Sequence, residues 1–507
     1  MKKIPRIAVI SLLAVIILFQ VGVRIFAGTQ KEYFHMDEMY SYGLMNYSQV
    51  SIADADDLMG RWHSPEYFQD YISISHEEAG DWSPVYNNQT ADVHPPLFYL
   101  LLRVFASLTI DGFSKWTGIV LNIMIWIGSA ILVFLISRRL TRDDRLALVI
   151  TLFVGLTAAM LNATLYIRMY ELAAFNILLI SHIALWLIDL KKLRWRHIIP
   201  IIIAISVGIM THYHYLFYLA ILSLLIIYNF YKTHRRADIV KFIVAGVIAM
   251  AICLSIFPAM VSQLLHGHPN SPDYFSTLQH IGQYLLILDH NVFNYMGIII
   301  AIAALIIIFV FRRKITFDRQ LLLLAIPVIT YFLIVAVTSP WIELRYIMPI
   351  CPIIAMTTLI ILVDLIKSYR PKQYRVIACA LIGILMIATP IIHPRLEMVY
   401  QQYNHIADRV VDLGSPILYV FNTSHNRFLD DVYLLTLTDS YVIDSQDINQ
   451  SDLEQVFVAK NVTGGLIVII NSGNENDLVL NQIETAAGLS HNEYLQRLNA
   501  ADIYYLN

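Results

Sequence analysis

The feature that most constrains this chain is a series of long apolar runs with almost no charge. When helical, a run of about 18 residues or more crosses the roughly 30 Å hydrocarbon core of a bilayer. We count about eleven such runs, at residues 6–27, 116–137, 146–163, 167–188, 197–211, 214–231, 240–262, 291–311, 320–338, 346–366 and 375–392. The sequence therefore predicts an α-helical polytopic membrane protein. Its composition agrees, because 57% of the residues are hydrophobic and only 14% are charged, against roughly 25% charged in soluble domains.

The basic connections between the runs predict the orientation in the membrane. Lys and Arg cluster near the N-terminus and in the connections at 138–145, 191–196, 232–241, 312–319 and 367–375. Such clusters stay on the cytoplasmic side. They alternate correctly with the crossings if Leu97–Ala106 is an interfacial helix, begun by two prolines, instead of a crossing. We therefore expect a cytoplasmic N-terminus and an extracytoplasmic C-terminus, in the plasma membrane of a prokaryote.

Two further regions lie on the predicted outer side. The first outer loop, residues 28–115 with its interfacial helices, is acidic: residues 28–94 hold twelve acids against two bases, Lys31 and Arg61. A connection this long is usually functional. After residue 393 the apolar runs shorten to strand length, at 417–421, 441–443, 466–470 and 503–506, and alternate with polar helical patterns. This change predicts a membrane domain at 1–392 and an extracytoplasmic α/β domain at 393–507.

Composition excludes several classes of partner and site. The formal net charge is −3, so no large basic face points to nucleic acid. The three cysteines lie in apolar runs, which favours buried structural thiols over a disulfide framework or a metal site. The C-terminal segment lacks a glycine-rich phosphate-binding loop, so we assign no chemistry to it.

Adjacent carboxylates, Asp37 and Glu38, follow the first crossing in the segment HMDEMYSYG. Such a pair can serve as a general base and its partner, or can bind a divalent cation. The alternative interpretation is a solvated acidic loop. His94, at the start of the interfacial helix, is either an incidental residue or part of a wall that returns to the outer opening.

Two arginines lie near the predicted outer ends of crossings. Arg168 and Arg345 could hold an anion, since arginine at membrane depth pairs with anions or lines a wet cavity. There are two alternatives. Either arginine could snorkel to the lipid headgroups, or Arg168 could form a local ion pair with Glu171. His212 and His214, in THYHY, could bind a metal or donate to phosphate, or belong to an interfacial aromatic belt.

Five motifs, taken in order, resemble those of a known family. They are the pair Asp37–Glu38, HPPLFYLLLR (His94–Arg103), RMY (Arg168–Tyr170), THYHY (Thr211–Tyr215) and RYIMPICP (Arg345–Pro352). The set is similar to polytopic GT-C glycosyltransferases of the protein-O-mannosyltransferase-like branch, which includes the bacterial enzymes that move aminoarabinose onto lipid A. The resemblance covers about residues 5–370 and leaves out the C-terminal segment.

The resemblance implies transfer of a sugar from a polyprenyl-phosphate carrier to an acceptor hydroxyl on a glycan, lipid or protein at the outer side. Asp37 matches the family's proposed base and Glu38 its neighbour, whereas Arg168 and Arg345 match positions near the carrier phosphate. We expect His94, His212 and Tyr346 to add donors there. The chain departs from many relatives because no acid shortly precedes the RMY arginine, which leaves metal binding open.

From these residues we predict an inverting displacement in which Asp37 accepts the proton of the acceptor hydroxyl. Arg345 and Arg168 would stabilise charge on the departing lipid phosphate. A transporter or lipid flippase without transferase activity is the alternative, because about eleven crossings and an intramembrane arginine also suit such proteins. A surface sensor is a third reading, although it leaves the Asp37 loop unexplained. The sequence does not specify the sugar or the acceptor.

Overall fold

The computed structural model describes residues 5–110, 112–265, 274–310, 318–366, 376–384, 396–403, 405–422, 427–462, 464–471, 476–489 and 491–507. Internal contacts divide the chain into two compact units. The helical unit comprises Met1–Phe26, Val93–Phe98 and Ile119–Leu396. The α/β unit comprises Ala27–Asp92, Tyr99–Gly118 and Glu397–Asn507. Each unit is described by itself.

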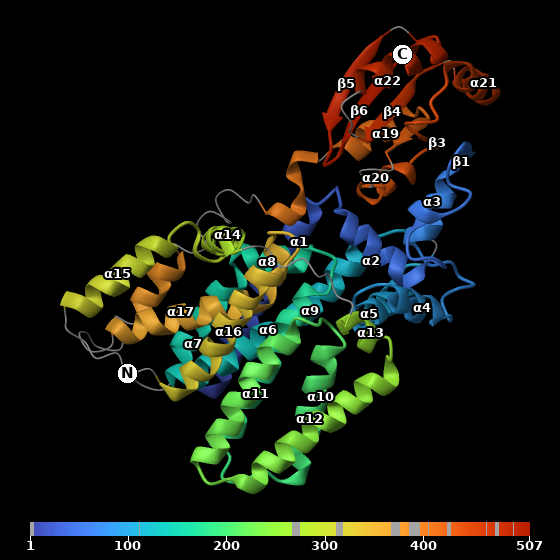
Figure 1. The fold of residues 1–507 in the computed structure, drawn as a ribbon. Helices are drawn as coiled ribbons and strands as arrows, with labels where there is room; N and C mark the ends of the chain where they lie inside the picture. The colour runs from blue at the N-terminus through green and yellow to red at the C-terminus, as the bar shows by residue number, and fades with distance from the viewer. Residues whose placement is uncertain are drawn as a thin grey trace. The chain divides into compact units, whose positions relative to one another are not determined.

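Long apolar helices make up the helical unit (Figure 1). Two of them, α1 and α6, begin or end in the other unit. The helices are α1 (Arg6–Thr29), α6 (Lys115–Thr141), α7 (Asp144–Gly155), α8 (Ala158–Leu165), α9 (Tyr170–Asp189), α10 (Ile198–Ile209), α11 (Tyr215–Lys232), α12 (Arg236–Ile256), α13 (Met260–Leu265), α14 (Tyr274–Phe293), α15 (Gly297–Val310), α16 (Arg319–Thr338) and α17 (Cys351–Ile366).

Among the described residues, six helices are long and apolar enough to cross a membrane: α1, α6, α9, α11, α12 and α16. The bent pair α7 and α8 would make a seventh. The predicted crossings at 197–211 and 346–366 correspond to shorter apolar helices, and the run at 291–311 is divided between α14 and α15. Half of the predicted crossing at 375–392, namely 375 and 385–392, lies outside the described residues. The protein is thus a membrane protein with several helices able to span the bilayer.

A sharp break between α7 and α8 shapes the buried centre of this unit. The two helices meet at 57°. The last residue of α7 is Gly155, where a Cβ would overlap the side chains of Gln20 and Trp126. Every residue of α8 is buried. A short non-helical link from Tyr166 to Met169 then joins α8 to α9 and carries Arg168.

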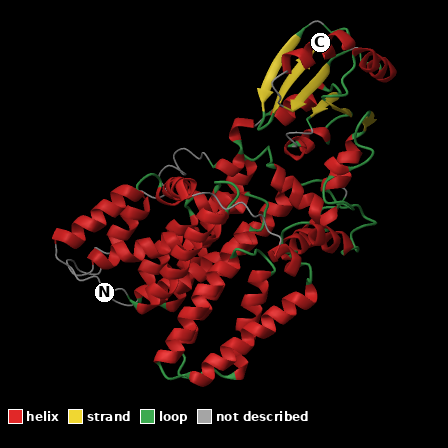
Figure 2. Cartoon of the chain, viewed as in Figure 1, coloured by secondary structure: helices red, strands yellow, loops and turns green. Residues whose placement is uncertain are grey.

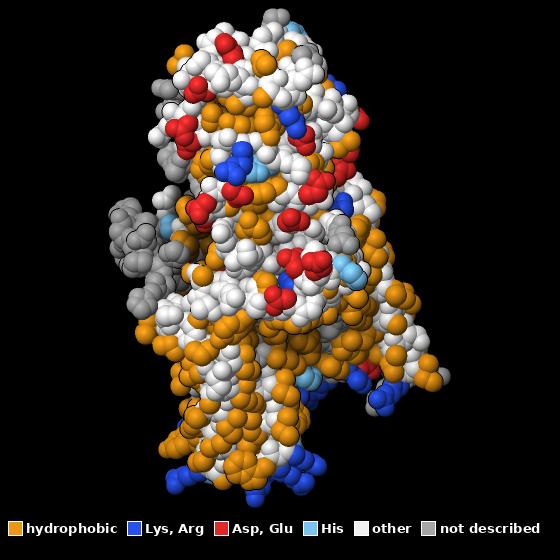
Figure 3. All heavy atoms as spheres, turned by 90° about the vertical axis from the view of Figure 1, so that its right-hand side faces the viewer, with side chains coloured by type: hydrophobic (Ala, Val, Ile, Leu, Met, Phe, Trp, Pro, Cys, Tyr) orange, Lys and Arg blue, Asp and Glu red, His pale blue; other side chains and the backbone are white. Residues whose placement is uncertain are grey.

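The outer faces of several helices carry exposed apolar side chains, as expected where lipid is the solvent. In α12, for example, Val240, Val247 and Ile256 are each more than half exposed. In Figure 3 the side chains along the helices at the bottom of the view are mostly hydrophobic, and Lys and Arg gather at the lower ends of these helices. This separation is the one that the positive-inside rule describes, and the orientation in the membrane stays a prediction.

A six-stranded sheet organises the α/β unit (Figure 2). Its strand order is β1-β3-β2-β4-β6-β5, with β2 parallel to both β3 and β4 and the other pairs antiparallel. The strands are β1 (Arg61–His63), β2 (Ile417–Phe421), β3 (Ser440–Asp444), β4 (Leu466–Asn471), β5 (Asn492–Arg497) and β6 (Ala501–Leu506). The four apolar runs predicted as strands correspond to β2, β3, β4 and β6.

Helices cover both faces of this sheet, which is why β2 and β4 are buried along their whole length. Alternate residues of a strand face opposite sides. Leu418 and Val420 therefore join the core formed with α21 (Gln450–Lys460) and α22 (Asn476–Ala487). Tyr419 and Phe421 instead contact Phe428 of α20 (Phe428–Leu435). The ring centroid of Phe428 lies 5.0 Å from that of Tyr419 and 5.9 Å from that of Phe421.

Most of the first outer loop belongs to this α/β unit. Its strand β1 pairs with β3, and its helix α2 (Met36–Asn46) packs against α20, α3 (Pro65–Ile72) and α4 (Ser83–Ala91). The contacts group residues 27–92 and 99–118 with residues 397–507, and the predicted division at 1–392 and 393–507 stays a prediction. A short helix, α19 (Ile406–Leu413), completes the unit.

The predicted interfacial helix is present as α5 (Leu97–Ala106). Its Arg103 is fully buried and does not reach solvent. One Nη donates to the carbonyl of Met45 at 2.6 Å, and the other donates to the carbonyl of Glu78 at 2.6 Å. Arg103 therefore links the carbonyl of Met45, in α2, to that of Glu78 in the same loop.

Candidate functional site

The two predicted catalytic carboxylates lie in the first turn of α2. His35 is the N-cap of this helix, and its Nδ1 accepts a hydrogen bond from the backbone N–H of Asp37 at 3.1 Å. In return, the Glu38 carboxylate accepts from the backbone N–H of His35 at 2.9 Å. This reciprocal capping box fixes where α2 begins and sends the two carboxylates in different directions.

Glu38 turns into the protein and forms a buried ion pair. Its Oε2 lies 3.0 Å from Lys31 Nζ, and both side chains are completely inaccessible. Lys31 also donates to the carbonyl of Met398 at 2.6 Å. Burial lowers the pKa of Lys31, and the adjacent Glu38 opposes that shift. Asp37 keeps 18% of its side chain exposed, with Oδ2 3.8 Å from His35 Nδ1, so it presents a carboxylate to solvent.

A second pair of acids, in α20, holds the segment that leads into α2. Asp430 Oδ1 accepts from the backbone N–H of Met36 at 2.7 Å. Asp431 accepts from Tyr33 Oη at 3.2 Å and from Tyr419 Oη at 2.9 Å. Burial, reinforced by Asp430, raises the pKa of Asp431 to about 8. The C-terminal part of the chain thus positions the helix that carries Asp37.

Sequence reasoning missed Asp430 and Asp431. The available signal was a pair of acids inside the apolar stretch FLDDVYLL, because buried carboxylates need partners. Their partners, Tyr33 and Met36, are almost 400 residues away along the chain.

Arg345 is the centre of the other group of predicted residues, in the helical unit. It lies in a 3-10 turn, Leu344–Tyr346, and is 8% exposed. Its Nη1 donates to Tyr166 Oη at 3.2 Å, and its Nε is 2.8 Å from Glu343 Oε2. The guanidinium carbon lies 5.2 Å from the ring centroid of Tyr346. These contacts hold the flat guanidinium in one orientation.

Rings connect Arg345 to the other predicted residues. Tyr166 stacks on Tyr170 with centroids 5.8 Å apart, and Tyr170 lies 5.6 Å from His212. His212 in turn lies 6.3 Å from His94 and 4.7 Å from His214. The structure therefore brings His94, His212, Tyr346 and Arg345 into one cluster, because His214 is also 6.1 Å from Tyr346.

Arg168 lies beside the same cluster. It is 5% exposed, and its backbone N–H donates to the carbonyl of Tyr166 at 2.7 Å. Burial lowers the pKa of His212, and the charges on His214, His94 and Arg168 lower it further. His212 therefore remains a neutral imidazole near the Arg168 guanidinium. Cationic forks with neutral N–H and O–H donors are suited to binding a phosphate.

The predicted site residues thus form two groups, one in each unit. Asp37 and Glu38 lie in the α/β unit, whereas Arg168, Arg345, His94, His212 and Tyr346 lie in the helical unit. Within each unit the residues of the group lie close together. The structure does not place one group relative to the other.

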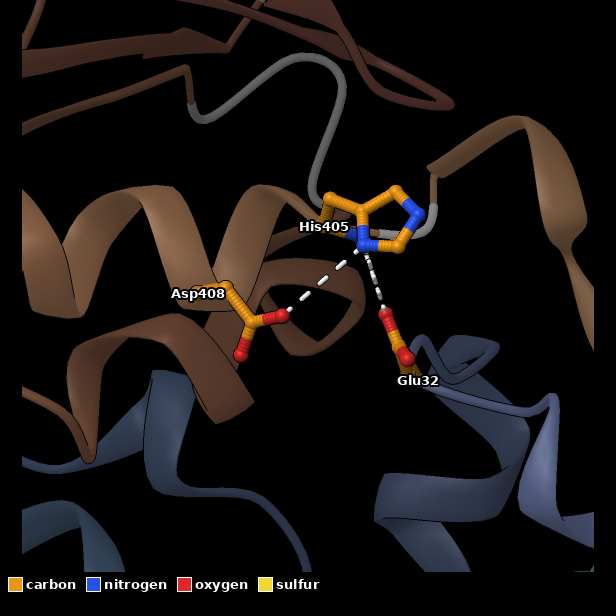
Figure 4. Close-up of side chains that lie close together, drawn as sticks. All are labelled: Glu32, His405 and Asp408. Carbon is orange, nitrogen blue, oxygen red and sulfur yellow. Dashed lines mark hydrogen bonds and ion pairs between the residues drawn. The ribbon is translucent and has the colours of Figure 1, made fainter.

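A cation at the predicted pair Asp37–Glu38 would have to displace the Lys31 ammonium from Glu38. Within the described residues, a different group has ligand atoms close enough to hold a metal ion: Glu32, His405 and Asp408, all within 4.8 Å of one another. His405 Nδ1 lies 3.8 Å from Glu32 Oε2 and from Asp408 Oδ2 (Figure 4). One imidazole and two carboxylates are donors that Zn²⁺ accepts, although His405 and Asp408 are largely exposed.

No protein-family model and no curated protein sequence matches this chain. Solved structures do match. ArnT from Cupriavidus metallidurans, a lipid A aminoarabinose transferase, is similar in its apo state with a TM-score of 0.51 and 12% identity, over 96% of this chain and 97% of that chain. Its complex with undecaprenyl phosphate gives a TM-score of 0.48, at 12% identity over 97% of both chains.

The apo oligosaccharyltransferase of Archaeoglobus fulgidus gives a TM-score of 0.47 at 11% identity, over 92% of this chain and 70% of that chain. At these identities the similarity establishes the fold, and the apo ArnT structure carries that conclusion. The chain has the GT-C fold of polytopic membrane glycosyltransferases, with a small mixed α/β sheet near its C-terminus.

Proposed function

We propose that this protein is a membrane glycosyltransferase that moves a sugar from a polyprenyl-phosphate donor to an acceptor hydroxyl on the extracytoplasmic side. The observation that carries the proposal is the buried cluster of Arg345, Arg168 and His212 in a chain with the GT-C fold. Arginines buried within a membrane domain often mark ligand or ion pathways, and a forked guanidinium is suited to binding phosphate oxygens. A lipid phosphate is an anion that such a cluster can bind.

Arg345 is the best candidate to hold the phosphate of the donor. Glu343 and Tyr166 fix its orientation at 2.8 and 3.2 Å, so little side-chain entropy is lost when a ligand binds. As the bond between the anomeric carbon and the phosphate oxygen breaks, negative charge grows on the leaving polyprenyl phosphate. A cation that is already in place stabilises that charge more than it stabilises the ground state.

Asp37 is the proposed general base. The acceptor oxygen attacks the anomeric carbon from the face opposite the phosphate, its proton passes to Asp37, and the anomeric configuration inverts. Glu38, which is fully buried, is a positioning residue: with Lys31 and the capping box it fixes the first turn of α2. This division of roles follows from exposure, because Asp37 reaches solvent and Glu38 does not.

The test compares Asp37→Asn with Asp56→Asn, an exposed acid of the same loop. The full chain is reconstituted in lipid vesicles with a polyprenyl-phosphate sugar and a mixed acceptor extract. Asp37→Asn should lower transfer by at least about 100-fold, as loss of a general base does, and Asp56→Asn should transfer at the native rate. Native-rate transfer by Asp37→Asn would remove Asp37 from the mechanism.

The proposal also fixes sidedness, since donor and acceptor meet at the outer face. Single cysteines at Lys192 and Asp444, introduced in a variant whose native cysteines are replaced, should react with a membrane-impermeant maleimide from opposite sides of sealed vesicles. Labelling of both from the same side would contradict the proposed orientation.

A further inference from the structure

The α/β unit contains a hollow of about 280 Å³ close to the start of α2. Its wall is partly aromatic, with Phe34, Phe113 and Tyr433. Its polar lining comes from Glu32, Asp408 and Ser114, together with two lysines. A small number of polar groups set among apolar and aromatic side chains is typical of small-molecule sites, and this volume suits one sugar ring.

The aromatic wall is built from three distant segments. The ring centroid of Phe34 lies 5.2 Å from that of Phe113 and 5.1 Å from that of Tyr433, and Phe113 and Tyr433 are 5.4 Å apart. Because the three rings brace one another, mostly edge to face, the surface is preformed. A pyranose has one face of C–H groups, which packs on aromatic carbon, and a rim of hydroxyl groups, which needs donors and acceptors.

The polar groups favour an uncharged ligand. Lys31 is already paired with Glu38, and Lys115 donates to the carbonyl of Lys31 and interacts with the carboxylate of Glu32. A phosphate or carboxylate ligand would meet the two acids, Glu32 and Asp408, whereas sugar hydroxyls can donate to them.

Chain connectivity places this hollow near the proposed base. Phe34 precedes Asp37 by three residues, and three residues span at most about 11 Å even when fully extended. Lys31 is one of the residues that border the hollow, and its buried ammonium pairs with Glu38 of α2. The hollow and the capping turn of α2 therefore share a wall.

From this arrangement we infer that the hollow is an acceptor subsite that binds one uncharged sugar ring. The inference rests on the proposed transferase function and makes it more specific: the acceptor is a glycan or glycolipid that presents a neutral hexose. The aromatic wall would hold the ring by its C–H face, with Glu32 and Asp408 accepting from its hydroxyls, so that a further hydroxyl is directed towards Asp37.

Binding is measured by saturation-transfer NMR on the full chain in lipid nanodiscs, since sugar-headed detergents would compete. The probes are the methyl α-pyranosides of glucose, galactose and mannose, with methyl glucuronide as the anionic probe. At least one neutral probe should give saturable transfer to both the native chain and Asp37→Asn. Glu32→Gln and Tyr433→Ala should weaken it at least tenfold, and Tyr494→Ala, an exposed tyrosine of β5, should leave it unchanged.

The absence of saturable transfer to the native chain would overturn the inference, as would equal binding by the Glu32 and Tyr433 variants and the native chain. Tighter binding of glucuronide would overturn the uncharged class. Because these readouts need no turnover, they are separate from the proposed function. Sugar binding without transfer would support the subsite and contradict the transferase function. Transfer whose acceptor KM is unaffected by Glu32→Gln would support the transferase function and contradict the subsite.

Discussion

Replacing Lys31 by methionine tests how strongly the buried ion pair holds α2. The change removes the ammonium that faces the buried Glu38 carboxylate and leaves its capping contact to His35 in place. Removing one partner of a buried pair costs about 3–5 kcal/mol. The reverse change, Glu38→Gln, should cost only about 1–3 kcal/mol. The amide oxygen of the new side chain can still accept from the backbone N–H of His35. Burial lowers the pKa of Lys31, so Lys31 can become neutral when the carboxylate is absent.

Hydrogen exchange of the α2 amides in the full chain reports this cost locally, without requiring reversible global unfolding. A loss of 3–5 kcal/mol corresponds to protection lower by about two to four powers of ten. In the double variant Lys31→Met, Glu38→Gln no charge is buried, so its cost should be clearly smaller than the sum of the two single costs. The two single costs would simply add if the residues did not interact.

The matched control is Lys460→Met, which removes the ion pair with Asp439 in the same unit. That pair lies at 2.6 Å, but each side chain is 39% exposed, and exposed pairs contribute about 0–1 kcal/mol. Its effect on protection should be at most about fivefold. Unchanged protection of α2 in Lys31→Met would refute the reasoning that burial makes the Lys31–Glu38 pair essential.

Three further predictions follow from individual contacts. Arg345→Ala should raise the KM for the lipid-phosphate donor by about 10- to 150-fold, which corresponds to the loss of a charge-assisted contact of about 1.5–3 kcal/mol. Tyr166→Phe removes only an orienting hydroxyl and should raise the donor KM less. Equal effects of the two changes would contradict the role of Arg345. Burial raises the pKa of Asp431 from 3.8 to about 8, so its contribution to stability is complete below pH 3.8 and is lost as the pH rises through about 8. Asp431→Asn should therefore flatten the decrease in hydrogen-exchange protection of the α/β unit between pH 4 and 8. An unchanged pH dependence would contradict the raised pKa of Asp431. Gly43→Ala should lower protection of α2 by a cost of about 1–3 kcal/mol, because its Cβ would overlap the ring of Tyr71; native protection would show that the ring can move aside freely.

Periodicity and run length predicted the elements that local sequence determines. The predicted interfacial helix, the long apolar helices and four of the six strands of the sheet are present. Strands β1 and β5 were missed because neither contains an apolar run. Arg61–His63 of β1 has one apolar side chain, Trp62, and pairs with the distant strand β3. Strand β5 is mostly exposed and pairs with its neighbour β6.

The sequence predicted which residues belong to the candidate site, but it did not predict the role of each residue. Composition could not distinguish Asp37 from Glu38, because the difference between them is burial, and that depends on Lys31 and the carbonyl of Met398. Arg103 lies within the predicted interfacial helix, and its burial against loop carbonyls was not evident from the sequence. In each case a long-range partner determines the role.

The most direct test of the account is whether the purified native chain releases free polyprenyl phosphate from a sugar-loaded carrier only when an acceptor is present. We predict acceptor-dependent release, with the sugar joined to the acceptor in the inverted anomeric configuration, and no release by Asp37→Asn. Movement of the intact sugar-loaded carrier across the vesicle membrane without release of polyprenyl phosphate would contradict the account and identify a flippase.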